Sequence, residues 1–184
     1  MTVLKLSDLK PAQILIILAL AYLNKYDKDK KQRSPEIQNI CKKYFCFDMD
    51  NSTFNNCMSG EKRRGLVRFG LISSEIGAGN QKYHMLELDN VKKVFFRGSN
   101  SKMKKEKEQK LLRMIEIASH IAYNLGYGFD NNISKLEKKR RKKSSNDIAK
   151  IIKDTLVRYT KTGFFHRHLL DEYPILFAEN PKGN

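Results

Sequence analysis

Residues 51–88, NSTFNNCMSGEKRRGLVRFGLISSEIGAGNQKYHMLEL, decide the fold of this 184-residue chain. Asp50, Asn51 and Ser52 are residue types that cap the first turn of a helix, so a helix is predicted to begin here. The side of this helix that is predicted to face the core carries Phe54, Met58, Leu66 and Phe69. Its other side is entirely polar and basic, with Asn55, Asn56, Ser59, Lys62, Arg63, Arg64 and Arg68.

The second half of the same segment has the pattern of a β-hairpin. Two runs in which apolar and polar residues alternate, Ser73–Ile76 and Lys82–Leu88, are joined by the Gly/Asn-rich connector Gly77–Asn80. Such a connector favours a tight turn between two strands. Leu86 and Leu88 are predicted to face the core. The residues expected at the hairpin tip are Asn80, Gln81 and Lys82.

Two helices are predicted before residue 51. The first, Pro11–Tyr26, contains the apolar run Ile14–Leu23, and a helix that is apolar nearly all round lies in a core. The second begins with Ser34 as its N-cap, Pro35 in the first turn and Glu36 near the positive helix end. Its apolar stripe is Ile37, Ile40, Cys41 and Tyr44.

Polar segments separate the predicted elements. Asp27–Arg33 is predicted to be a solvated loop. After the hairpin, Asp89 and Asn90 are predicted to cap a short helix over Val91–Phe96. Gly98–Ser101 has the composition of a linker. We therefore predict one domain at 1–98 and a second region at 102–184.

The second region is predicted to be all-helical. A long helix over Met103–Leu125 ends at Gly126, and Ser145-Asn146-Asp147 caps a further amphipathic helix that ends at Gly163. The apolar stripe of the long helix, which predicts a core or a dimer interface, is Leu111, Met114, Ile115, Ala118, Ala122 and Leu125. The basic run Lys138–Lys143 fits a phosphate-binding arm, a nuclear-localisation-like cluster or a solvated helix face.

The charge of the chain indicates its class of partner. It has 36 Lys and Arg against 20 Asp and Glu, a formal net charge of +16. The excess is spread along the chain, with 17 basic and 10 acidic residues at 1–100 and 19 and 10 at 101–184. Such a charge attracts polyanions, because each neutralised phosphate releases counterions. Nucleic acid is therefore the expected partner, and an anionic membrane surface is the weaker one.

Other features exclude whole classes of protein. The apolar run has ten residues, whereas a bilayer-spanning helix needs about 20, and no secretory signal is recognisable. The three cysteines lack CxxC spacing, which argues against a disulfide framework and for a reducing compartment. We expect a cytoplasmic, nucleoid-associated protein with no membrane partner.

The order helix, helix, helix, hairpin, helix over residues 11–96 resembles the winged helix-turn-helix fold, most closely regulators of the MarR type. The residues that carry the resemblance are Ser52-Thr53 and the run LVRFGLI at Leu66–Ile72, which looks like the end of the family's recognition helix. Lys62 and Arg63 depart from it, because such helices usually place an apolar residue there. The resemblance implies a mainly α protein: three helices and a β-hairpin wing, followed by C-terminal helices that form a homodimer.

It also implies which residues contact DNA. A recognition helix enters the major groove with its N-terminal residues, and Asn and Arg side chains pair with adenine and guanine edges. The expected base readers are Ser52, Thr53, Asn55 and Asn56. The expected phosphate contacts are Arg63, Arg64 and Arg68, with Ser59 and Lys62 on the same face. The wing tip, Asn80, Gln81 and Lys82, is expected to meet the neighbouring minor groove or backbone.

The predicted function is therefore sequence-specific binding of double-stranded DNA by a dimeric transcriptional regulator that needs no cofactor. A plasmid or viral replication or partition protein is one alternative, and a protein-interaction adaptor is another. A third is a ribonuclease, since six residues separate Arg113 from His120, a spacing that resembles the pattern of HEPN-type ribonucleases. No metal or catalytic site is predicted at the other histidines, His84, His166 and His168.

Overall fold

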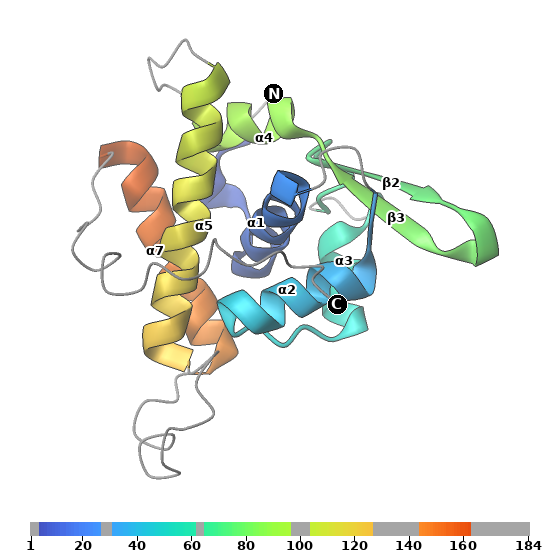
Figure 1. Ribbon diagram of the computed structural model, residues 1–184, viewed down its shortest axis with the longest axis horizontal. Helices are drawn as coiled ribbons and strands as arrows, with labels where there is room; N and C mark the ends of the chain where they lie inside the picture. Colours follow the sequence, from blue (N-terminus) through green and yellow to red (C-terminus); the bar gives the residue numbers. More distant parts are fainter. Residues whose placement is uncertain (1–3, 27–30, 62–64, 97–103, 127–143, 163–184) are drawn as a thin grey trace.

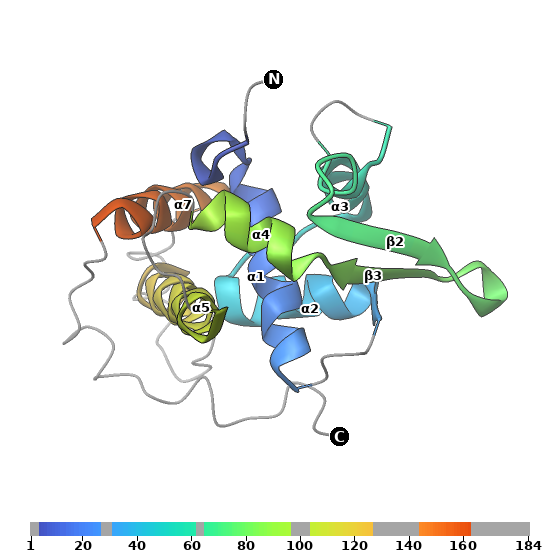
Figure 2. The ribbon, with the colours of Figure 1, turned by 90° about the horizontal axis from the view of Figure 1, so that it is seen from above.

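The computed structural model describes residues 4–26, 31–61, 65–96, 104–126 and 144–162. Within these ranges the protein is mainly helical and contains a small three-stranded antiparallel sheet. Seen from above, α5 and α7 lie on one side of the central helix α1, whereas α3 and the β-hairpin lie on the other side (Figure 2). The hairpin extends away from the helices (Figure 1).

Helix α1 (Pro11–Tyr26) is the centre of the core, as its sequence predicts. Every residue of Ile14–Leu23 is at most 7% exposed. The side chain of Gln13 accepts a hydrogen bond from the backbone N–H of Lys10 (2.9 Å) and so caps the start of the helix. Helices α2, α5 and α7 all contact α1, which explains why the apolar residues surround it instead of forming one stripe.

Helix α2 (Ser34–Phe45) buries the predicted stripe of Ile37, Ile40, Cys41 and Tyr44. Its N-cap is Arg33, so the prediction of Ser34 as the cap was wrong by one residue. The reason is that the Glu36 carboxylate accepts a hydrogen bond from the backbone N–H of Arg33 (2.9 Å). This bond satisfies a donor that would otherwise have no partner at the helix start.

Helix α3 (Asn51–Met58) is much shorter than predicted. Its start is confirmed, because the Asp50 carboxylate accepts a hydrogen bond from the backbone N–H of Thr53 (2.6 Å). The prediction that the helix continues to Leu66 and beyond was wrong. Ser59 is the C-cap, with a ψ of 131° that is not helical, and by Leu66 the chain has folded back onto the helix, so Leu66 and Arg68 lie outside the helix.

The reversal after α3 depends on a close approach at Gly65. A side chain at this position would overlap the carbonyl group of Ser59. Because glycine permits this approach, the next residues bond back to the last turn of α3, with Leu66 N to Cys57 O at 2.8 Å and Val67 N to Met58 O at 3.2 Å. Leu66 therefore reaches the core, as predicted, although it does so from a turn.

The sheet has the strand order β1-β3-β2. The predicted hairpin is confirmed as β2 (Ile72–Ile76) and β3 (Lys82–Leu86), joined through the short 3₁₀ helix η2 (Ala78–Asn80). Residue pairs across the hairpin are Ile72 with Leu86, Ser74 with His84, and Ile76 with Lys82. Strand β1 (Gln32–Arg33) pairs with β3. The prediction of a solvated loop over Asp27–Arg33 was therefore wrong for its last two residues.

Helix α4 (Leu88–Phe95) begins three residues before the predicted Val91. Its N-cap is Glu87, so the predicted caps Asp89 and Asn90 lie inside the first turn. The Asn90 side chain donates instead to the carbonyl of Gly70 (2.8 Å). This bond fixes the start of α4 against the turn that leads into β2.

Helices α5 (Lys104–Gly126) and α7 (Ser145–Thr162) agree with the predicted C-terminal helices within one or two residues. The Ser144 hydroxyl accepts the hydrogen bond from Asp147 N (3.2 Å), so the cap lies one residue before the predicted cluster. Buried residues of both helices belong to the same hydrophobic cluster as α1. Lys153 on α7 also donates to the carbonyl of Leu9 (2.6 Å), next to the 3₁₀ helix η1 (Leu6–Asp8).

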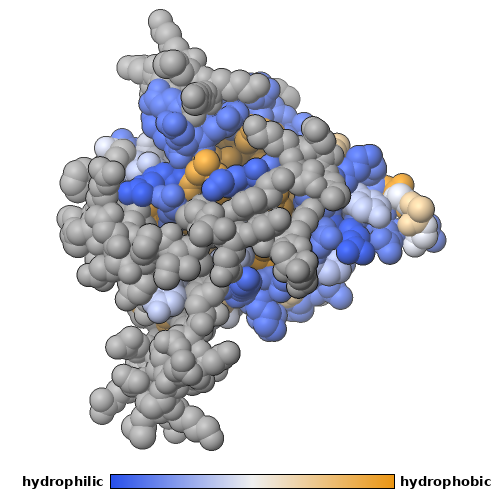
Figure 3. All heavy atoms as spheres, in the orientation of Figure 1, coloured by the Kyte–Doolittle hydropathy of each residue, from blue (hydrophilic) through white to orange (hydrophobic). Residues whose placement is uncertain are grey.

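Within the described ranges, none of the helices combines the length and the apolar composition that crossing a membrane requires. Figure 3 shows a mainly hydrophilic described surface on one face of the molecule, with a hydrophobic spot at the end of the hairpin.

Candidate nucleic-acid interface

Helix α3 exposes one polar stripe and buries the opposite side. Asn51, Ser52, Asn55 and Asn56 are exposed, while Thr53 and the following Ser59 are half-buried. Ser52, Asn55, Asn56 and Ser59 recur every three or four residues and so share one face, and Thr53 lies at its edge. The other face is anchored in the core by Phe54, Cys57 and Met58. Five of the predicted contact residues are therefore brought together here: Ser52, Thr53, Asn55, Asn56 and Ser59.

The start of α3 is held rigidly against α2. The Gln38 side-chain amide donates to Met49 O and to Asn51 Oδ1, both at 3.1 Å. The hydrogen bond from the Thr53 backbone N–H lowers the pKa of Asp50, because this bond favours the carboxylate form. The exposed N-terminal end of α3 therefore has a fixed position and a negatively charged cap.

The hairpin end carries the second group of predicted residues. Asn80, Gln81 and Lys82 are all exposed there. Ile76, the cross-strand partner of Lys82, is 69% exposed. Tyr83 supports the tip from the other face, where it packs so closely on Gly77 that a Cβ atom at Gly77 would lie 2.6 Å from the ring.

A groove of about 570 Å³ lies between α3 and the hairpin. We call it the α3–hairpin groove. The predicted contact residues that line it are Asn55, Asn56 and Ser59 from α3 and its end, and Lys82 from the hairpin. Two sets of residues that are more than 20 positions apart in the sequence therefore border one concave surface.

His84, which lines this groove, connects α2, β2 and α3. Its imidazole is hydrogen-bonded through Nε2 to the Ser34 hydroxyl of α2 (2.9 Å) and through Nδ1 to the Ser74 hydroxyl of β2 (2.7 Å). Its ring also meets Phe54 of α3 in an edge-on contact, with 5.6 Å between centroids. Burial, and then the nearby charge of Lys82, lower the pKa of His84 to about 4, so the ring is neutral at pH 7.

Sequence reasoning placed His84 on a strand but missed this role. The hydroxyl groups of Ser34 and Ser74 were the available signal, since Ser74 lies directly opposite His84 in the hairpin. The Ser34 contact, however, spans 50 residues and depends on how α2 meets the sheet.

Lys82 is the one predicted basic contact that lines the groove among the described residues. Arg68 is exposed in the turn that follows Gly65, while the predicted contacts Lys62, Arg63 and Arg64 lie outside the described residues. Glu61 and Glu75 also line the α3–hairpin groove. Glu75 forms an ion pair with Lys31.

The two residues of the predicted catalytic alternative lie on α5. Arg113 pairs with Glu116 (2.6 Å), and His120 is 4% exposed. Across the described ranges, no group of three or more histidine, cysteine or acidic residues could hold a metal ion. His166, His168 and the basic run at 138–143 lie outside the described residues.

The cysteines are free thiols, and Cys41 and Cys57 are buried. Burial raises the pKa of both thiols, so neither is poised as a nucleophile.

Comparison of the chain with protein-family models, with curated proteins and with solved structures gave no match.

Proposed function

We propose that this protein binds double-stranded DNA, with the exposed face of α3 in the major groove and the hairpin end on the adjacent backbone or minor groove. One observation carries the proposal: two of the predicted base readers of α3, Asn55 and Asn56, and one of the predicted hairpin contacts, Lys82, border the same groove. This arrangement is what a winged helix-turn-helix requires. The succession α1, α2, α3, β2 and β3 is also the order that this fold predicts.

The cross-section of α3 suits this role. An α-helix with its side chains is about 10–12 Å across, and the major groove of B-DNA is about 12 Å wide. Asn55 and Asn56 each carry an amide that can pair with adenine through two hydrogen bonds. The rigid attachment of Asn51 to Gln38 reduces the entropy that would be lost when the helix is positioned on DNA.

The contacts divide into two kinds. Asn55 and Asn56 are proposed to read bases, and Arg68 and Lys82 are proposed to bind phosphates, with Arg63 and Arg64 assigned to phosphates from the sequence alone. A net charge of +16 strengthens association with any polyanion. Transcriptional regulation as a homodimer, with two half-sites read by two copies, is the biological role that we propose.

Two double variants test the proposal. Arg63→Ala with Arg64→Ala should weaken duplex binding at least about tenfold at moderate salt and should lower the salt slope by about two. Asn55→Ala with Asn56→Ala should remove the preference for a selected sequence and leave the salt slope unchanged. Fluorescence anisotropy at several salt concentrations, with duplex DNA, single-stranded DNA and RNA, measures both effects.

The matched control is Lys150→Ala with Lys161→Ala, because both lysines are exposed on α7 and the variant loses the same charge. If this control weakens binding as much as the arginine variant does, the protein binds by overall charge and the proposed interface is wrong.

A further inference from the structure

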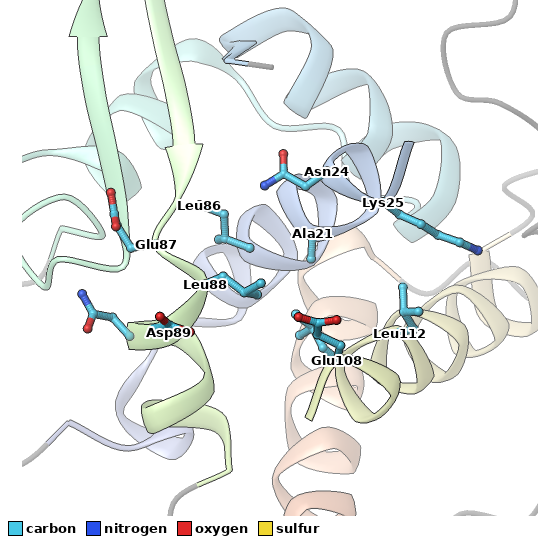
Figure 4. A pocket seen from close by; sticks show the side chains of 11 residues that line it. Ala21, Asn24, Lys25, Leu86, Glu87, Leu88, Asp89, Glu108 and Leu112 are labelled. Carbon is cyan, nitrogen blue, oxygen red and sulfur yellow. The ribbon is translucent and has the colours of Figure 1, made fainter. Parts of the chain in front are cut away.

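A second groove lies between the C-terminal end of α1, the start of α4, and α5 (Figure 4). It shares no lining residue with the α3–hairpin groove. Its volume is about 700 Å³, within the range of about 300–1,000 Å³ that is usual for small-molecule pockets. We call it the carboxylate groove, because Glu87, Asp89 and Glu108 line it.

The carboxylate groove combines acidic side chains with an apolar surface. Leu86, Leu88 and Leu112 supply apolar lining. Figure 4 shows Glu87 and Asp89 on one side of these leucines and Lys25 on the opposite side. Lys25 is the only basic residue among the described ones that line the groove.

Hydrogen bonds fix the acidic wall in place. The backbone N–H of Glu87 donates to the carbonyl of Leu71 (2.9 Å), and the Asn90 side chain donates to the carbonyl of Gly70 (2.8 Å). Both bonds hold the start of α4 to the turn before β2. A wall that is already ordered loses little entropy when a ligand binds.

The three carboxylates are not equivalent. Glu108 forms an ion pair with the buried Lys92 (3.1 Å), so its charge balances a buried cation and joins α5 to α4. Within the described residues, the carboxylates of Glu87 and Asp89 take part in no ion pair. These two charges are therefore available to a ligand.

We propose that the carboxylate groove binds a small organic cation with an apolar body, whose charge lies at Glu87 and Asp89 and whose body covers the leucines. The charge of the lining favours a cation, because the groove has three carboxylates and one lysine among its lining residues, although the whole chain has a net charge of +16. A protein partner would need about 800 Å² of surface on each side, which favours a small ligand for a pocket of this size.

Tetraphenylphosphonium and tetraphenylborate provide a direct test, because the two ions have nearly the same shape and opposite charge. In amide NMR spectra of the full chain, the cation should shift the signals of Glu87–Asn90 and Leu111–Leu112. The anion should leave these signals unchanged, although it binds elsewhere on a basic protein.

Glu87→Gln with Asp89→Asn should weaken binding of the cation about five- to tenfold, as expected for two partly exposed ion pairs. Asp48→Asn with Asp154→Asn removes the same charge from positions outside the groove and should leave the affinity unchanged. The proposal is overturned if the cation shifts only amide signals outside the groove, or if both ions shift the amide signals of the groove. It is also overturned if the two double variants bind the cation equally well. This result is independent of nucleic-acid binding.

Discussion

The α3–hairpin groove and the carboxylate groove have comparable volumes, about 570 and 700 Å³, and both include acidic residues, but the rest of their linings differs. Amide, hydroxyl and lysine groups dominate the predicted contacts of the first, whereas carboxylates and leucines line the second. One basic chain thus presents two concave surfaces, for which we propose different ligands. The lesson is that net charge indicates a class of partner for the whole molecule, while the local residues decide where that partner binds.

The largest expected effect comes from Gly65→Ala, which should damage the α3–hairpin groove. A side chain here overlaps the Ser59 carbonyl, so the turn that carries Leu66 into the core must move. We expect a loss of about 3 kcal/mol or more in the free energy of unfolding, measured by urea denaturation.

The matched control is Gly60→Ala, because a Cβ atom there would lie 3.4 Å from Val67 Cγ1, an ordinary contact. At a temperature where Gly65→Ala remains folded, duplex DNA binding should be lost and tetraphenylphosphonium binding retained. Equal stability of the two variants would show that the close approach at Gly65 does not hold α3 in place.

An intermediate effect on the free energy of unfolding is expected from pH, through His84 in the α3–hairpin groove. The pKa of His84 is about 4 in the folded protein against an ordinary value of 6.5, so the unfolded chain binds the proton more readily. The stability that His84 contributes is complete above pH 6.5 and declines as the pH falls towards 4. The loss should reach about 2–3 kcal/mol near pH 4.5.

Urea denaturation at pH 7.5 and 4.5 measures this loss, and His84→Asn provides the reference, since asparagine does not titrate. The wild type should lose more stability than His84→Asn over this interval. Parallel pH profiles for the two proteins would contradict a buried, neutral His84.

The smallest expected effect comes from single carboxylates. Glu61 lines the α3–hairpin groove and is exposed, so it should repel DNA phosphates. Glu61→Gln should strengthen duplex binding about two- to threefold at low salt, and the gain should shrink as salt rises. Glu87→Gln, in the carboxylate groove, removes the same charge and should leave DNA affinity unchanged. An equal gain from both variants would mean that the two grooves are not electrostatically separate.

Most of the fold could be predicted from local sequence patterns. The apolar run of α1, the stripe of α2 and the Gly/Asn connector of the hairpin each determine structure within about ten to fifteen neighbouring residues. Those predictions are confirmed because the deciding interactions are short-range. The residues of α3 up to Met58 follow the same rule, with Asp50 as the cap.

The rest depended on contacts between distant segments. Strand β1 has two residues and no alternating pattern, and it exists because Gln32 pairs with His84. The end of α3 depends on the close approach of Gly65 to the Ser59 carbonyl. A helical pattern of apolar residues does not predict this contact. The candidate interface was predicted in composition, but its geometry was not, because Arg68 follows the reversal and does not lie on the helix.

The enclosure of α1 has a consequence for how the protein is made. Its ten-residue apolar run is synthesised well before two of the helices that contact it, α5 and α7. The hydrogen bond from Lys153 to the carbonyl of Leu9 joins residues that are 144 positions apart in the sequence. During translation the sides of the run that α5 and α7 bury therefore stay uncovered until these helices have left the ribosome, and contacts of this separation form slowly. Holding the nascent chain in a chaperone-bound state over that interval would prevent the aggregation that exposed apolar helices promote.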